Sequence, residues 1–139
     1  MTTIITDEGF APEDWTHEIT PLDQLAANDA APVIAIDIPS DGDPSTLADK
    51  VDAIDMIRVV FPSFADGRGF TIARRLRDMG FQGRLRAKGH VIADQYAMAR
   101  RAGFDEVEID DELAQRQPED QWLRRADWKA HNYQSRLRA

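Results

Sequence analysis

The sequence predicts an α/β domain with a layered, mostly parallel sheet of about four or five strands and flanking helices. Two apolar runs, residues 33–38 and 56–61, are rich in β-branched side chains, which is typical of strands covered on both faces; the first lies between two prolines and the second ends at one. Helical patterns follow both runs, and this alternation favours parallel strands joined by right-handed crossovers. Half of a (β/α) barrel fits the same alternation. We expect the open sheet, because so few strands cannot close a barrel.

The length of 139 residues fits one domain over residues 1–139. Residues 1–29 are expected to form a peripheral N-terminal segment, with an edge strand at residues 4–5. Thr20-Pro21 indicates the start of a short helix that ends near Asn28, because a hydroxyl cap followed by proline is typical of a first turn.

The middle of the chain continues the alternation. Asp43-Pro44 indicates the start of a second helix, and residues 70–79 predict a third that stops at Gly80. Residues 84–87 predict a short strand, residues 91–102 a helix, and residues 106–109 an outer strand. A C-terminal helix is expected over residues 118–138, where aromatic and apolar residues recur at helical spacing: Trp122, Ala126, Tyr133 and Leu137.

Composition excludes several functions. Without cysteine there is no disulfide, thiol nucleophile, Cys-ligated zinc or iron–sulfur cluster. His17, His90 and His131 lack metal-ligand spacing, so we expect no metal and no cofactor. A net charge of −8 argues against a nucleic-acid or anionic-membrane partner. The chain shows neither a membrane-length apolar run nor a signal pattern, so we expect a cytoplasmic protein.

The charge is unevenly distributed. Residues 1–57 hold thirteen acids and one lysine, whereas residues 58–104 hold ten basic residues and three acids. The central block therefore has the charge to attract a small anion or an acidic partner surface. Alternatively, the acidic flanks fold back and neutralise it.

Two loops of this block are predicted to follow neighbouring strands, where ligands of parallel sheets gather. The first contains Asp66, Gly67, Arg68 and Gly69 and leads into a helix, whose free N–H groups favour an anion. The second runs from Arg86 through Lys88 to His90. If the strands are neighbours, Arg68, Arg86 and Lys88 converge on an anion or a partner. The alternative is that Asp66 and Arg68 only lock a tight turn.

Candidate catalytic residues are few. His90 and Asp94 lie one helical turn apart and fit an acid–base pair, although a surface histidine near a helix start explains His90 equally well. With this pair the chain would be a small enzyme acting on a phosphorylated or sulfated metabolite. A sheet this short also leaves edges to cover, so a homodimer is a further expectation.

The central segment resembles a bacterial family catalogued as domain-of-unknown-function family 934. The resemblance covers about residues 30–135 and includes the Asp-Gly-Arg-Gly and Leu-Arg-Ala-x-Gly elements. The residues that carry it are Phe61-Pro62-Ser63-Phe64-Ala65-Asp66-Gly67-Arg68-Gly69-Phe70, Ala73-Arg74, Leu76-Arg77, Gly83-Arg84-Leu85-Arg86-Ala87 with Gly89, Asp94-Gln95, Gly103-Phe104-Asp105 and Tyr133-Gln134.

Members of this family are usually encoded beside genes for sulfite reductase and adenylylsulfate reductase, and many are labelled as oxidoreductases of sulfite reduction. The resemblance therefore implies an accessory protein of assimilatory sulfate and sulfite reduction. It implies sulfite reductase as a partner and, together with the basic loops, a small oxyanion as a ligand.

Overall fold

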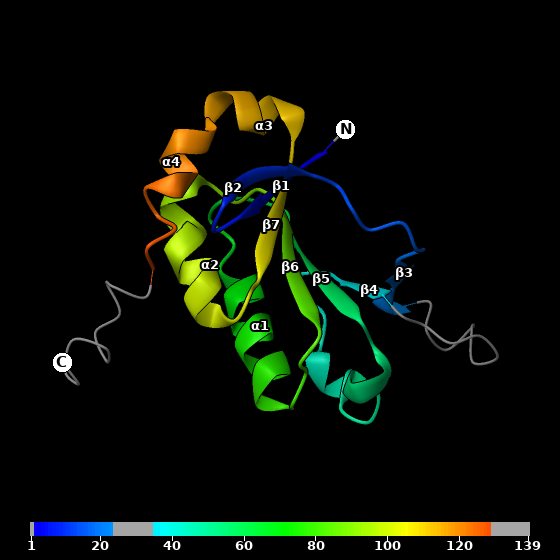
Figure 1. Ribbon diagram of the computed structural model, residues 1–139. Coiled ribbons are helices and arrows are strands. Elements are labelled where there is room, and N and C mark those ends of the chain that lie inside the picture. Colours follow the sequence, from blue (N-terminus) through cyan, green and yellow to red (C-terminus); the bar gives the residue numbers. More distant parts are fainter. Residues whose placement is uncertain (1, 24–34, 129–139) are drawn as a thin grey trace, which may run out of the picture.

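The computed structural model describes residues 2–23 and 35–128, which form a seven-stranded sheet in the order β2-β1-β7-β6-β5-β4-β3 (Figure 1). The strands are β1 (Thr2–Thr6), β2 (Gly9–Pro12), β3 (Thr20–Pro21), β4 (Ala35–Ile38), β5 (Met56–Phe61), β6 (Arg84–Gly89) and β7 (Glu106–Asp110). Strands β3 to β7 are parallel and lie in sequence order, whereas β1 pairs antiparallel with both β2 and β7.

The predicted α/β class and the open sheet are confirmed. The sheet is larger than expected, because the hairpin of β1 and β2 adds two antiparallel strands to the five parallel ones. The five parallel strands lie in sequence order with their helices on one face, as a half barrel would also have them, and the edge strands β2 and β3 do not pair with each other, so the sheet is open. Both edge strands are short, and the expected homodimer stays a prediction.

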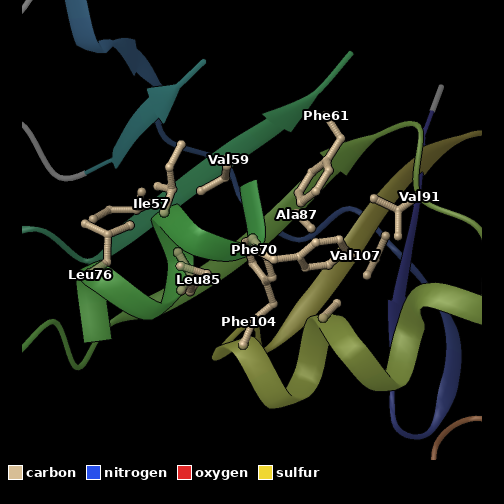
Figure 2. Packing of buried hydrophobic residues seen from close by; sticks show 14 of the residues in the cluster. Ile57, Val59, Phe61, Phe70, Leu76, Leu85, Ala87, Val91, Phe104 and Val107 are labelled. Atoms are coloured by element: carbon tan, nitrogen blue, oxygen red, sulfur yellow. The ribbon is translucent and has the colours of Figure 1, made fainter. Parts of the chain in front are cut away.

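All the helices that contribute to the core cover one face of the sheet. They are α1 (Arg68–Asp78), α2 (Tyr96–Ala102) and α4 (Glu119–Leu123), with α3 (Asp111–Arg116) beyond the end of β7. Right-handed connections between parallel strands in sequence order must all lie on the same side, which explains this one-sided arrangement. Figure 2 shows Phe70, Leu76 and Phe104 packed against alternate residues of β5, β6 and β7.

Several element boundaries differ from the expectations. The predicted second helix is replaced by two 3-10 turns, Pro44–Leu47 and Val51–Ala53, although Asp43 caps the first as expected. The helix expected over residues 91–102 is a 3-10 turn, Ala93–Gln95, followed by α2.

At the N-terminal end, β3 occupies the start of the expected helix, because Thr20 pairs with Ile36 of β4 and the sheet outweighs the local capping signal. Residues 22–23 form a 3-10 turn, and residues 24–28 of that helix, like residues 33–34 of the first predicted strand, lie outside the described residues. Residues 1–29 were expected to be peripheral, but the described part of this segment supplies three strands. Strand β7 is therefore internal and not outer, since Thr3 of β1 pairs with Ile109.

At the C-terminal end, α4 ends at Leu123, well before the end of the predicted helix. Trp122 is buried against Tyr96, and Arg125 beyond it bonds Asp94, so the chain is held in turns and does not continue the helix. Residues 129–139 of the predicted helix lie outside the described residues. Helix α3 was not predicted at all.

Residues 13–19, here called the strap, join β2 to β3 and cross the sheet face opposite α1, α2 and α4 (Figure 1). From Pro12 to Thr20 the chain reaches at most about 26–29 Å, whereas six strand spacings require roughly 29 Å. The strap therefore crosses the sheet with little length to spare, although its backbone bends at residue 17.

Gly69 lets α1 approach β5 closely. A Cβ atom at this position would lie within 2.8 Å of three carbons of the buried Phe61 ring, which packs against Phe70 and Phe104 at centroid distances of 5.0 and 5.8 Å. Gly67, at the N-cap of the same helix, has open space around the corresponding position. The two glycines of the motif therefore have different roles.

We predict that Gly69→Ser lowers the free energy of unfolding by about 1–3 kcal/mol, because it overpacks the Phe61 site. The matched Gly67→Ser should change it by less than about 0.5 kcal/mol, since serine is favoured at an N-cap. Urea unfolding of both variants measures the difference. Equal costs at the two positions would show that close packing at Gly69 does not matter.

Candidate functional site

The carboxyl ends of β4, β5, β6 and β7 meet at one edge of the sheet, here called the carboxyl edge. Ligands of open α/β sheets bind at this edge, in the loops that follow the strands. The two basic loops of the sequence follow β5 and β6, which are neighbours as predicted. The carboxyl edge is therefore the candidate ligand-binding site.

The loop after β5, residues 62–67, is here called the Phe64 loop, and it is braced from three sides. Asp66 accepts hydrogen bonds from the backbone N, Nε and Nη2 of Arg68 at 3.1, 3.0 and 2.7 Å. Arg68 Nη2 also donates to Ser40 Oγ after β4, and Gln95 Nε2 donates to the Phe64 carbonyl at 2.9 Å. The hydrogen bonds from Arg68 hold the pKa of Asp66 well below its usual range.

The braced loop presents one aromatic side chain to solvent. Phe64 is 42% exposed, and its ring packs edge-on against His90 with the centroids 5.1 Å apart. Asp66 and Arg68 contact each other as expected for residues that lock a tight turn, and the Arg68 side chain stays 60% exposed. Its predicted role in binding an anion or a partner remains a prediction.

Arg86 lies two residues before Lys88 on the same face of β6, and not in the loop at the carboxyl edge. Strand β6 extends to Gly89, beyond the predicted end, so Arg86 is in mid-strand and its side chain points to the face without helices. It is fully buried, and its guanidinium donates to Glu106 at 2.6 Å, Glu108 at 2.7 Å and Glu13 of the strap at 2.5 Å. These carboxylates surround the cation that was expected to meet a ligand.

Arg86 is the centre of a larger ion-pair network, here called the charged face. From β4 to β7, acids and arginines alternate in space, each bonded to the next: Asp37, Arg58, Glu108, Arg86, Glu106 and Arg84. The strap adds Glu13 on Arg86 and Asp14 on Arg84. The fold-back of acidic flanks onto basic residues, one of the two alternatives, is thus present at this face.

Burial and charge act in opposite directions on these groups. Burial acts to lower the pKa of Arg86, but hydrogen bonds and attraction from its three carboxylates raise it above its ordinary value. The hydrogen bond from Arg84 lowers the pKa of Asp14. Both shifts favour the charged forms of Arg86 and Asp14.

A cavity of about 380 Å³ opens at the carboxyl edge between the loop after β6 and α3, a size typical of small-molecule sites. Gly89 shapes its rim, because its φ of +115° is left-handed and a Cβ would lie 2.6 Å from the Phe61 carbonyl oxygen. The lining residues are Thr2, Phe64, Lys88, Gly89, His90, Glu108, Ile109, Asp110, Glu112, Leu113 and Arg116.

His90 and Asp94 do not form a hydrogen-bonded pair. Asp94 accepts a hydrogen bond from Arg125 at 2.7 Å, whereas the exposed His90 ring packs on Phe64 and lines the cavity. The geometry expected for an acid–base pair is therefore absent from these two residues, and any catalytic role of either one stays a prediction.

Several residues of this region were not foreseen. Thr2 and Arg116 reach the cavity from β1 and α3, elements whose placement depends on pairing between distant parts of the chain. The partners of Arg86 had a visible signal: basic residues alternate along β6 at Arg84 and Arg86, and acids alternate along β7 at Glu106 and Glu108. This pattern predicts one shared charged face when the strands are neighbours.

The fold and the cavity define an α/β protein with a ligand-sized site at the carboxyl edge of a parallel sheet. The family described as "Bacterial protein of unknown function (DUF934)" matches residues 35–139, and the chain belongs to this family. No curated protein and no solved structure matches it.

Two features are absent from residues 2–23 and 35–128. None of the helices there has the length and apolar character needed to cross a bilayer. Within the same residues, no group of three or more His, Asp or Glu side chains is placed to hold a metal ion.

We predict that Arg86→Met lowers the free energy of unfolding by about 3–5 kcal/mol, because it leaves buried carboxylates without their cation. The matched Arg74→Met, at an exposed position of α1 with no ion pair to any described residue, should change it by less than about 0.5 kcal/mol. Urea unfolding measures both. A small effect at Arg86 would mean that the charged face does not stabilise the fold.

Proposed function

We propose that this protein is a cytoplasmic accessory protein of assimilatory sulfite reduction, and that it docks on sulfite reductase through the Phe64 loop. The resemblance of its central segment to family 934 supports the pathway. The loop geometry supports a docking role, and one observation carries it: an exposed aromatic side chain is held out on a braced loop.

Aromatic anchors contribute strongly to protein interfaces when they enter a pocket of the partner. A loop that is already ordered loses little conformational entropy on binding, so more of the contact energy appears as affinity. Arg68, Ser40 and Gln95 hold the loop from both neighbouring connections of the carboxyl edge. Arg68, four residues after Phe64 in the chain, also remains exposed, and arginine and aromatic side chains are both enriched at protein interfaces.

The alternative function, a small enzyme acting on a phosphorylated or sulfated metabolite, requires His90 and Asp94 to act together. The ion pair between Asp94 and Arg125 directs that carboxylate to α4 and away from the cavity lining. This geometry favours binding over catalysis as the role of the carboxyl edge.

We predict that the immobilised full chain retains purified sulfite reductase, and that Phe64→Ala weakens this binding at least about tenfold by removing the anchor. Met98→Ala is the matched control, because Met98 is 47% exposed on α2 and lies outside the Phe64 loop. Surface plasmon resonance measures the three affinities.

Failure of the wild-type chain to bind sulfite reductase would contradict the proposal. So would equal weakening by Phe64→Ala and Met98→Ala, which would indicate that the Phe64 loop is not the contact.

A further inference from the structure

At the carboxyl edge, the charged face ends with a cation that pairs with no carboxylate of the described residues. Along β6 the side chains of Arg84, Arg86 and Lys88 follow one another on this face, opposite the acids of β7. Arg84 bonds Glu106, and Arg86 bonds both Glu106 and Glu108. Lys88 is the next cation in the series.

Lys88 has no acid of its own. Its register partner Glu108 accepts hydrogen bonds from Arg86 at 2.7 Å and from Arg58 at 3.1 and 3.4 Å. Among residues 2–23 and 35–128, Lys88 forms neither an ion pair nor a hydrogen bond through its side chain, although it is half-buried. An ammonium group that is partly removed from water and unpaired gains from any anion that reaches it.

The cavity at the carboxyl edge lies beside Lys88. Lys88 lines it together with His90, Arg116 and the apolar residues Ile109 and Leu113. We infer that this cavity binds a small oxyanion of the size of sulfite or sulfate. Its oxygens would accept from Lys88 as the carboxylate oxygens of β7 accept from Arg84 and Arg86. The inference goes beyond the proposed docking and does not depend on it.

The acidic residues that line the cavity favour a small anion over a large one. Glu108, Asp110 and Glu112 also line the cavity; Glu108 already pairs with Arg86 and Arg58, and Glu112 pairs with Arg116. An extended acidic surface would meet these carboxylates and be repelled, whereas a single small anion contacts Lys88 without covering them. The cavity therefore suits a compact anionic ligand and not an acidic protein surface.

The test titrates the full chain with sodium sulfite, and separately with sodium sulfate, against a sodium chloride control at equal ionic strength. Nitrogen–proton correlation spectra should show saturable shifts of the Gly89 and His90 amides with at least one of the two oxyanions. Lys88→Gln should weaken that affinity at least about tenfold, the size of one charge-assisted contact. Lys50→Gln, at an exposed lysine outside the cavity, should leave it unchanged.

Two further variants sharpen the result. Lys88→Arg keeps the charge and should retain binding, which separates loss of the cation from damage to the fold. Asp110→Asn keeps a cap that can accept from Leu113 N but removes a negative charge, so it should tighten oxyanion binding by about two- to fivefold. Weaker binding in this variant would overturn the inference, because a carboxylate would then assist the ligand.

The inference is also overturned if neither oxyanion shifts these amides at millimolar concentration, or if Lys88→Gln binds as tightly as the wild type. Its failure is separable from that of docking. Sulfite reductase bound without oxyanion binding would leave docking intact, and oxyanion binding without sulfite reductase would leave the cavity site intact.

Discussion

Because the crossovers from β4 to β7 lie on one side of the sheet, none of the helices in residues 2–23 and 35–128 covers the opposite face, and a buried arginine organises that face. Arg86 is fully buried yet contacts carboxylates from β7 and from the strap. Removing a charge from water costs several kcal/mol unless its partners compensate. The partners do so here, and the same contacts fasten the strap across the sheet. The position of the strap, and of the strands β2 and β3 that it joins, therefore depends on the ion pairs of Arg86 and not on apolar packing alone.

The charged face and the carboxyl edge use similar side chains for different purposes. On the face, each arginine is matched by acids within the chain, so these cations serve the fold. At the edge, Lys88 forms no ion pair with the residues that the structure describes, and Arg68 stays largely exposed although it pairs with Asp66. This division corrects the simplest interpretation of the basic central block, in which all its cations would serve a ligand. Position along a strand decides the role, because two residues separate a buried structural arginine from a lysine that lines a cavity.

Local signals predicted much of the parallel part of the sheet. Strand β5 has its predicted bounds, since its β-branched run ends at a proline, and α1 ends near Gly80, whose φ is +98°. The hairpin of β1 and β2 could not be predicted in the same way, because Thr3 pairs with Ile109 across more than a hundred residues. The expected meeting of Arg68 and Arg86 failed for a related reason: a strand two residues longer than predicted moves Arg86 from a loop to the middle of a face. The Phe64 loop was found from its glycines and charges, but its support by Gln95 depends on tertiary contact.

The most direct test of this organisation is a double-mutant cycle between Arg86 and Glu108, with Arg86→Met, Glu108→Gln and the double variant compared by urea unfolding. Since Glu108 is bonded to Arg86 on a buried face, we predict a coupling free energy of about 1.5–3 kcal/mol, with the double variant less destabilised than the two single changes together imply. Additive effects of the two changes would contradict the central role of Arg86, because they would show that the buried cation and its nearest carboxylate stabilise the fold independently.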